Sequence, residues 1–273
     1  MKLYLAIVMT LLATPTLAQQ IPVDVENDPR YNSVCWVQNS AEYRALTTQI
    51  YRMAFTQFCI GLKDPYWSAD EIQLSEGNFE QKKPAVILDV DETVLDNSPY
   101  NARNIELNLK YTTESWTAWC QEEKAGPVPG AVEFVRAVEG LGAEIFYVTN
   151  RQDDVRQSTL NNLKKLGFPV KDNHLLTKNS KKGRGGDKLS RRALVCKDHR
   201  VVLLIGDNLS DLFSGMEDSN TEQRNQVAKR KVRMLGSRWI VLPNPVYGSW
   251  ERALPDGKEA LITKSGSDSG GKK

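Results

Sequence analysis

Residues 85–100 read A-V-I-L-D-V-D-E-T-V-L-D-N-S-P-Y, and they are the most informative stretch of the chain. Its apolar run has the length of a buried β-strand and ends in two carboxylates, Asp89 and Asp91, spaced i, i+2. In an α/β sheet, ligands bind at the carboxyl ends of the strands. Side chains alternate along a strand, but a chain that leaves the strand can turn the second carboxylate back toward the first. The two carboxylates would repel each other without a cation, and Mg²⁺ suits a site of oxygen ligands.

Three later apolar runs also have strand length, and two of them end in polar residues of catalytic type. Segments with helical spacing lie between the runs, and one of them closes at Gly167, a residue type that often ends a helix. Strands that alternate with helices predict an α/β fold with a doubly wound parallel sheet. The predicted strands are residues 86–88, 143–148, 201–205 and 238–242, and the clearest helices are residues 42–62, 131–139 and 155–166.

The first 18 residues have the features of a secretory signal peptide. A short charged start is followed by an apolar stretch of about ten residues and by a small-x-small site that ends at Ala18. A membrane anchor would need roughly 18 or more apolar residues. Gln19 rather than Cys follows the site, so we expect no lipid attachment and no stable membrane anchor. The predicted location is the periplasm in a Gram-negative host, and the protein would be secreted otherwise.

The remaining chain fits one main domain with an accessory part. We expect an N-terminal helical region at residues 19–80 and a core at residues 81–255, with a helical insertion near residues 97–128. Residues 256–273, rich in Ser, Gly, Asp and Lys, are expected to form a disordered tail.

Charge gives no sign of a polymeric partner. The chain has 36 Lys and Arg against 34 Asp and Glu, so it has no general attraction to nucleic-acid polymers or membrane surfaces. In an exported protein, an even number of cysteines permits disulfides, with three pairings for four residues. The sequence leaves open whether the cysteines pair or remain buried thiols: Cys35, Cys59, Cys120 and Cys196.

Several classes of phosphate chemistry are excluded by what the chain lacks. It has two histidines, neither of them in an Arg-His-Gly context, which argues against multi-histidine metal phosphatases. No cysteine is followed six positions later by arginine, and no Gly-x-Ser-x-Gly elbow is present. Residues 183–188 lack the spacing and the Ser/Thr of a phosphate-binding P-loop. Of the common kinds of phosphate chemistry, the one that uses aspartate side chains remains.

The aspartates that follow the predicted strands can be given chemical roles. Asp89 can attack phosphorus as a carboxylate nucleophile and form an aspartyl-phosphate. Asp91 can protonate the leaving alkoxide and then deprotonate the attacking water. Asp207 and Asp211, four residues apart where a strand meets a helix, can complete a Mg²⁺ shell together with Asp89 and Asp91.

Two further residues complete the predicted catalytic set. Thr149 could donate a hydrogen bond to a phosphoryl oxygen, and Lys188 could offset negative charge on the phosphoryl group and on Asp89. Alone, each motif has an ordinary structural explanation, such as a turn, a helix cap or a solvated charge. Their occurrence in order, three of them after predicted strands, favours a phosphoryl-transfer site.

The ordered motifs resemble those of the haloacid dehalogenase superfamily of phosphohydrolases, and more narrowly those of the class C bacterial acid phosphatases. The resemblance covers about residues 30–255. It is specific in four segments: V-I-L-D-V-D-E-T-V-L-D-N-S-P-Y at 86–100, D-K-L-S-R-R at 187–192, V-L-L-I-G-D-N-L-S-D-L-F at 202–213 and L-P-N-P-V-Y-G-S-W-E at 242–251.

This resemblance implies a Rossmann-like core, a smaller and mostly helical part built from both chain ends, Mg²⁺ dependence, and hydrolysis of phosphomonoesters at acidic pH. Nucleoside monophosphates are frequent substrates in the family. Many members are lipoproteins, and the chain departs from them at Gln19. We therefore predict an exported Mg²⁺-dependent acid phosphatase with 5′-nucleotidase activity. The alternatives are a phosphotransferase that uses the same intermediate and a non-catalytic surface binding protein on the same fold.

Aromatic residues near these motifs are candidates for substrate binding. The insertion lies where the superfamily builds substrate-covering elements, and an aromatic ring there can stack on a nucleobase. The competing explanation is that Trp116 and Trp119 form one apolar helix face. Arg191 and Arg192 are expected to be surface or helix-face charges, one of which could contact phosphate, and a homodimer is left open. The candidate substrate-binding residues are Tyr100, Trp116, Asn150, Arg151 and Tyr247.

Overall fold

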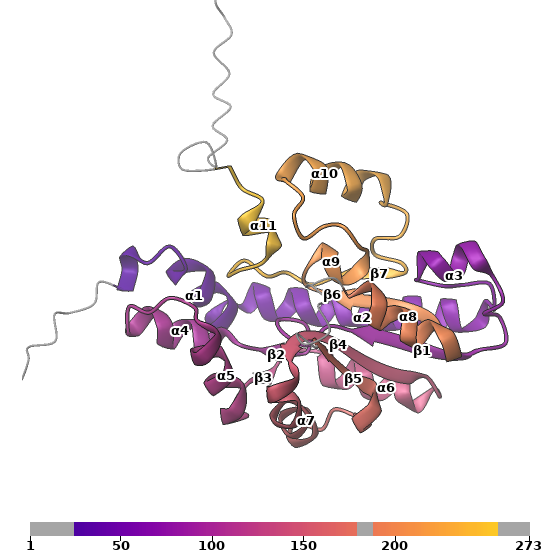
Figure 1. The fold of residues 1–273 in the computed structure, drawn as a ribbon, viewed down its shortest axis with the longest axis horizontal. Coiled ribbons are helices and arrows are strands. Elements are labelled where there is room, and N and C mark those ends of the chain that lie inside the picture. Colours follow the sequence, from indigo (N-terminus) through magenta and orange to yellow (C-terminus); the bar gives the residue numbers. More distant parts are fainter. Residues whose placement is uncertain (1–24, 179–187, 256–273) are drawn as a thin grey trace, which may run out of the picture.

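The computed structural model describes residues 25–178 and 188–255. A five-stranded sheet has the order β5-β4-β1-β6-β7, and each neighbouring pair of strands is parallel. β1, which leads into Asp89, therefore lies at the centre of the sheet (Figure 1). The strands are β1 (Lys83–Leu88), β4 (Glu144–Gln152), β5 (Leu175–Lys178), β6 (His199–Gly206) and β7 (Trp239–Val241).

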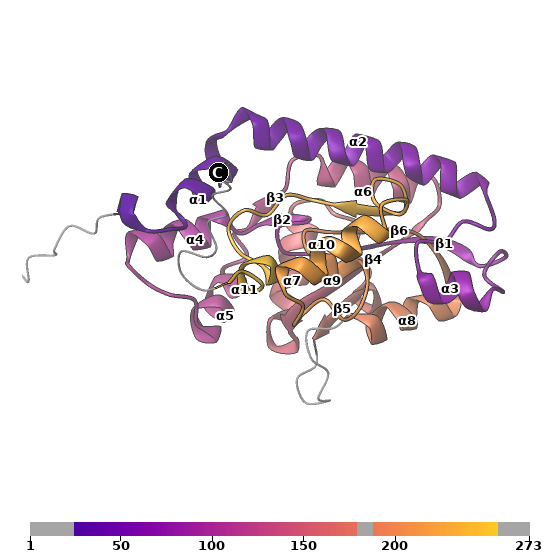
Figure 2. The same cartoon turned by 90° about the horizontal axis from the view of Figure 1, so that it is seen from above.

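Helices surround this sheet, and the longest, α2, lies along one side of it (Figure 2). In the described residues the helices are α1 (Tyr31–Asn39), α2 (Ala41–Lys63), α3 (Glu71–Glu76), α4 (Ser98–Glu106), α5 (Thr113–Glu122), α6 (Ala131–Gly140), α7 (Arg156–Lys165), α8 (Leu189–Asp198), α9 (Leu209–Leu212), α10 (Thr221–Arg230) and α11 (Ser249–Arg252).

Both faces of β1 are buried. Val86 and Leu88 belong to one hydrophobic cluster, which includes residues of α2, α6 and α7. Ala85 and Ile87 belong to another, with residues of α8 and α9. Successive side chains of a strand point to opposite faces, so a strand covered on both sides needs a continuous apolar run. The predicted doubly wound parallel sheet is confirmed.

Helix α2 supports the loop that follows β1. Its N-terminus is capped by Ser40, whose side chain accepts a hydrogen bond from the backbone N–H of Tyr43. Tyr51, Ala54 and Phe58 then place one apolar stripe of the helix in the core. The hydroxyl of Tyr51 donates a hydrogen bond to the carbonyl oxygen of Thr93. A helix from the N-terminal part of the chain thus contacts the Asp89–Thr93 segment directly.

Two features of the sheet differ from the predictions. β5 was not predicted, because its four residues, L-L-T-K, are too few to show a periodic pattern. β4 is longer than predicted and continues to Gln152, so residues 149–151 lie within the strand instead of after it. Gln152 pairs with Lys178 of β5 after a register shift. The extension thus depends on a neighbouring strand that local sequence did not indicate.

Residues from three distant parts of the chain meet beside the sheet. α4 and α5 lie between β1 and α6 in the sequence, together with the short antiparallel strands β2 (Leu95–Asp96) and β3 (Gly126–Pro127). A small hydrophobic cluster joins Val34 of α1, Ile105 of α4 and Val246 near the C-terminal end. One wall of the molecule is therefore built from both ends of the chain and the insertion.

Some predictions fall outside the described residues, namely the signal peptide at 1–18 and the tail at 256–273. Among residues 25–178 and 188–255, no helix has the length and apolar character needed to cross a membrane. The four cysteines lie in the described part of the chain and are free thiols there: Cys35, Cys59, Cys120 and Cys196.

Candidate active site

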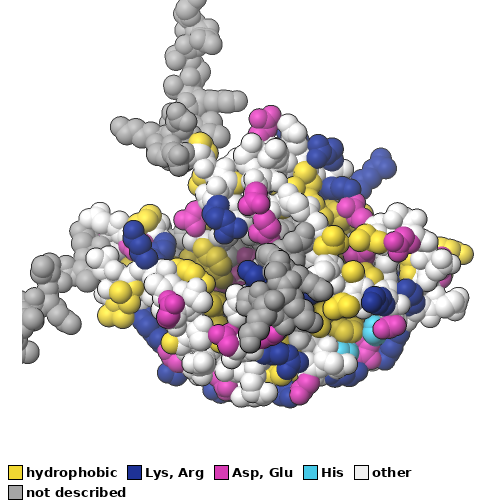
Figure 3. Space-filling model, viewed as in Figure 1, with side chains coloured by type: hydrophobic (Ala, Val, Ile, Leu, Met, Phe, Trp, Pro, Cys, Tyr) yellow, Lys and Arg dark blue, Asp and Glu magenta, His cyan; other side chains and the backbone are white. Residues whose placement is uncertain are grey.

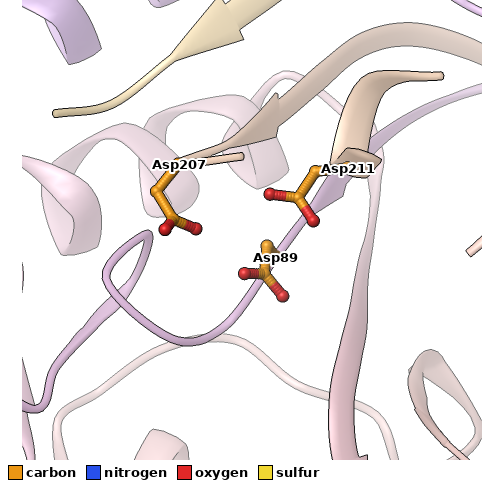
Figure 4. A group of neighbouring side chains, drawn as sticks. All are labelled: Asp89, Asp207 and Asp211. Carbon is orange, nitrogen blue, oxygen red and sulfur yellow. The ribbon is translucent and has the colours of Figure 1, made fainter. Parts of the chain in front are cut away.

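Three carboxylates converge at the carboxyl end of the sheet. Asp89 follows β1, Asp207 follows β6, and Asp211 lies in α9. One oxygen from each lies within 4.8 Å of the others, and the side chains point toward one another (Figure 4). The backbone N–H of Asp89 donates to the carbonyl oxygen of Ile205, so β1 and β6 stay paired up to the site. A group of oxygen donors at this spacing could hold a hard divalent cation.

The turn from β6 into α9 is built to bring Asp211 close. A Cβ atom at Gly206 would overlap with Cβ and Oδ2 of Asp211, so only glycine fits. Asn208 caps α9, and Oδ2 of Asp211 accepts a hydrogen bond of 2.9 Å from the backbone N–H of Asn208. The Gly-Asp-Asn segment is thus a tight turn and also the support of two site carboxylates.

Lys188 supplies positive charge to this cluster. Its ammonium group contacts Oδ1 of Asp89 and lies 2.7 Å from Oδ1 of Asp211, and the residue is buried. Burial alone would lower the pKa of Lys188, but the carboxylates of Asp211 and Asp89 outweigh it and hold the pKa above its ordinary value. Lys188 therefore remains charged and bridges two carboxylates that would otherwise repel each other.

One lysine does not neutralise three carboxylates. Burial raises the pKa of Asp89 to about 7; Lys188 opposes this shift, and Asp211 and Asp91 add to it. Burial, followed by repulsion from Asp211 and Asp89, also raises the pKa of Asp207 well above its usual range. Burial, and after it the mutual repulsion of the carboxylates, therefore disfavours the fully ionised cluster, whose three negative charges face one lysine. The all-oxygen donor set and this charge deficit both fit a bound divalent cation.

Asp91 lies outside this group and has other partners. Its Oδ1 accepts hydrogen bonds from Nε (2.9 Å) and a terminal nitrogen (2.8 Å) of Arg151, and from the amide of Asn97 (2.9 Å). The hydroxyl of Thr149 lies 3.5 Å from the other oxygen, Oδ2. Among the described residues, the polar contacts of Asp91 therefore fall on Oδ1, and Oδ2 has only this long contact. Arg151, nearly fully buried, also donates to Thr159.

Arg191 and Arg192 are not surface charges, contrary to the prediction. Both are buried at the start of α8. Arg191 donates to the carbonyl oxygen of Thr149 and to the side chain of Asn150 (2.7 Å), while Arg192 donates to the carbonyl oxygen of Asp211 (3.0 Å). Backbone carbonyl groups at buried strand and helix ends need donors, and a long guanidinium can reach them.

The carboxylate cluster and Lys188 line a cleft of about 1350 Å³, whereas Thr149 is fully buried and is not among its lining residues. Figure 3 shows a hollow on this face in which hydrophobic side chains lie beside acidic and basic ones. Among the predicted aromatic residues, Tyr100, Trp116 and Tyr247 line the cleft, and the rings of Tyr100 and Trp116 pack edge to face at 5.1 Å. Trp119 is instead buried in the core. The other predicted residues that line it are Asp89, Asp91, Asn150, Arg151, Lys188, Asp207 and Asp211.

Two buried or partly buried amides that hold site residues were not predicted from the sequence. Asn97 contacts Asp91, and Asn244 donates to Oδ2 of Asp207 (2.8 Å). Both lie inside the segments singled out above, in D-N-S-P-Y and L-P-N-P-V-Y. The available signal was a short amide side chain next to a motif residue, but Asn is also common in turns, and turns explained both positions adequately.

Comparison with known proteins identifies a family and relatives of known structure. Residues 16–250 match the family model described as HAD superfamily, subfamily IIIB (Acid phosphatase). The class C acid phosphatase from Bacillus anthracis is 32% identical, with a TM-score of 0.72 over 90% of this chain and 93% of that one. The same enzyme with tungstate bound gives a TM-score of 0.69 over 87% of this chain and 91% of that one, again with 32% identity.

Plant proteins are more distant relatives. A stem 31 kDa glycoprotein of Glycine max is 28% identical over 59% of this chain, and acid phosphatase 1 of Solanum lycopersicum is 26% identical over 59%. The chain spans 58% and 57% of the length of these two curated relatives. The family match and the bacterial structure together cover most of the described residues, so the chain belongs to the HAD superfamily, subfamily IIIB (acid phosphatase) family.

Proposed function

We propose that the protein is an exported, Mg²⁺-dependent acid phosphatase that hydrolyses phosphomonoesters, nucleoside 5′-monophosphates in particular, through a phospho-Asp89 intermediate. The observation that carries this proposal is the group of buried Asp89, half-buried Asp207 and buried Asp211, with Lys188 between two of its members. Family membership and the tungstate-bound bacterial relative, which holds a tetrahedral oxyanion, support the same reaction class.

The residues divide the reaction into two steps. In the first, a carboxylate oxygen of Asp89 attacks phosphorus, and Asp91 gives a proton to the leaving oxygen. In the second, Asp91 takes a proton from water, and the oxygen of that water attacks the phosphoryl group and releases Asp89. Lys188 offsets the charge of Asp89 and of the phosphoryl oxygens. Asp89, Asp207 and Asp211 would hold Mg²⁺, which when bound supplies further positive charge to the transferred group.

The shape of the cleft supports a substrate larger than phosphate. Trp116 and Tyr247 both line it, on the insertion and on the C-terminal segment respectively. Stacking on an aromatic ring is worth about 1–3 kcal/mol per base. We assign Tyr247 as the first contact for the base and Trp116 as the second. Trp119, whose ring is buried, is not part of this assignment.

The proposal is tested by assaying the purified protein at pH 5–6 with Mg²⁺ or EDTA. The substrates are a nucleoside 5′-monophosphate and 4-nitrophenyl phosphate. Mg²⁺-dependent release of phosphate from both, faster for the nucleotide, is the expected result. Release from the aryl ester alone would remove the nucleotide assignment. No release from either, by folded protein with metal present, would contradict the phosphatase proposal and favour the binding protein.

Two parts of the proposal need their own measurements. Added alcohol would distinguish a phosphotransferase, because a phosphorylated alcohol would then appear at the expense of free phosphate. Export is tested by determining the N-terminus of the protein recovered from the cell exterior or periplasm. A start at Gln19 is expected, and an intact Met1 in all of the protein would contradict cleavage.

A further inference from the structure

Asn97 lies at the centre of a buried hydrogen-bond network beside Asp91. The residue is fully buried between β2 and α4. Its Nδ2 donates to Oδ1 of Asp91 (2.9 Å) and to Oε2 of Glu92 (3.4 Å). Its Oδ1 accepts from Nε1 of Trp119 (2.8 Å) and from a terminal nitrogen of Arg151 (3.2 Å). One amide therefore joins the segment after β1, the end of β4 and helix α5.

The chemistry of these partners fixes the orientation of the amide. Trp119 and Arg151 can only donate hydrogen bonds, so the atom that faces them is the oxygen. The carboxylate of Asp91 accepts, so the atom that faces it is the nitrogen. A second bond supports this arrangement, because the backbone N–H of Asn97 donates to Oε1 of Glu92 (2.8 Å). At this position only a side chain with both a donor and an acceptor satisfies every partner.

The network has a consequence for the proton of Asp91. Two N–H groups of Arg151 and one of Asn97 point at Oδ1, and an oxygen that accepts three donors has no room for a proton of its own. A protonated Asp91 therefore holds its proton on Oδ2. This is also the oxygen for which the described residues provide only the long contact with Thr149.

We propose that Asn97 is a positioning residue for acid catalysis, which acts by fixing the Oδ1 side of Asp91 so that Oδ2 presents the proton to the leaving group. The inference rests on the proposed function, in which Asp91 is the general acid. It also assigns a role to the insertion: Trp119 anchors α5 to Asn97, so the insertion and the orientation of Asp91 are linked through one hydrogen bond of 2.8 Å.

Leaving-group dependence distinguishes this role from a general effect on folding. A nitrophenolate departs without help from an acid, whereas the alkoxide of an alkyl phosphate needs a proton. We would measure kcat/KM for 4-nitrophenyl phosphate and for an alkyl phosphate, because this ratio reports the step in which the leaving group departs and not the later hydrolysis of phospho-Asp89. Asn97→Ala should lower kcat/KM roughly 10- to 100-fold more for the alkyl ester, because a positioned acid contributes about 10²–10⁴-fold. Trp119→Phe removes one hydrogen-bond donor and keeps an aromatic ring. The rate for the alkyl ester should then fall roughly 2- to 10-fold more than the rate for the aryl ester.

Asn104→Ala is the matched control. Asn104 is also a buried asparagine of this region, on α4, but its Nδ2 has no hydrogen-bond partner among the described residues, and it does not line the cleft. Asn104→Ala should change the catalytic efficiency for the two esters by the same factor. Thermal unfolding of each variant shows whether it is folded. If Asn97→Ala does not fold, the comparison of the two esters is made with Trp119→Phe instead.

Each outcome has a separate meaning. Equal losses on the two esters, or no loss, in folded Asn97 and Trp119 variants would overturn the positioning role. The assignment of Asp91 itself is checked with Asp91→Asn, which should show the leaving-group dependence in its strongest form. If wild-type protein is inactive on both esters, the proposed function fails first. If Asp91→Asn shows the dependence and Asn97→Ala does not, only the present inference fails.

Discussion

The side-chain amide of Asn244 connects a site carboxylate to the wall of the cleft. Its nitrogen donates to Oδ2 of Asp207 at 2.8 Å, and its oxygen accepts from the backbone N–H groups of Val246 (3.0 Å) and Tyr247 (3.3 Å). The carboxylate cluster and the segment that carries Tyr247 are thus held by opposite ends of one side chain.

Asn244→Ala should weaken both functions of this contact. Residues that orient metal ligands typically change metal affinity by about 10- to 100-fold, and we expect a loss of that size for Mg²⁺ measured by calorimetry. The KM for a nucleoside monophosphate should rise as well, because the segment around Tyr247 loses its support. Asn225→Ala, an exposed position on α10, is the control and should change neither value. Unchanged Mg²⁺ affinity in Asn244→Ala would contradict the orienting role.

Asp89→Asn should abolish turnover. The amide has nearly the shape of the carboxylate but cannot attack phosphorus, and loss of a nucleophile costs roughly 10⁴-fold or more in kcat. Release of phosphate from 4-nitrophenyl phosphate measures this loss. Asp172→Asn provides the same chemical change at an exposed residue, where it removes a surface pair with Lys164 and should leave kcat intact. A variant at Asp89 that keeps more than a tenth of wild-type turnover would rule out the aspartyl-phosphate.

Gly206→Ala should disturb Asp211 without changing any charged residue. The new methyl group would overlap with Cβ and Oδ2 of Asp211, so α9 must shift away from β6. We expect lower Mg²⁺ affinity and a kcat reduced by roughly 100-fold, since small displacements of catalytic groups have effects of this size. Gly140→Ala, where an added Cβ meets nothing within 4 Å, should be active. Full activity in Gly206→Ala would show that the tight turn is not needed.

His174 should make the protein less stable in acid. Burial lowers the pKa of His174 below its usual 6.5; the carbonyl oxygen of Ile145 and the carboxylate of Glu144 oppose this shift, while Lys171 and His199 add to it. The folded protein therefore binds this proton less readily than the unfolded chain. The contribution of His174 to the free energy of unfolding is present above pH 6.5 and is lost as the pH falls below it.

The measurement is Tm at pH 7.5 and at pH 5 for wild type and His174→Gln. The Tm of the variant should fall less between pH 7.5 and pH 5 than the Tm of wild type, because glutamine does not titrate. His199, whose pKa burial also lowers, remains in the variant and preserves part of the effect. An identical drop in both proteins would mean that His174 does not contribute. Activity at pH 5–6 under the proposed function thus coincides with a pH range of reduced stability.

Most of the fold could be predicted because its signals are local. The central strands β1 and β6 each contain a continuous apolar run, followed by Asp89 after β1 and by Asp207 and Asp211 after β6. The structure brings one oxygen from each of these three aspartates within 4.8 Å of the others. β5 could not be found, since four residues of mixed character carry no periodicity. The two arginines of α8 were misjudged for a related reason: a charged side chain is exposed on average, and only its carbonyl partners explain its burial.

In the site, too, some features have local sequence signals and others depend on contacts between distant residues. The parallel sheet and the positions of Asp89, Asp91 and Asp207 after its strands could be predicted from local sequence, because strand patterning and strand ends are properties of adjacent residues. The groups that hold these carboxylates became evident only in the folded chain. Asn97 and Asn244 act on residues that are six and 37 positions away through side-chain hydrogen bonds. Such contacts depend on distances across the folded chain, and no short-range pattern in the sequence records them.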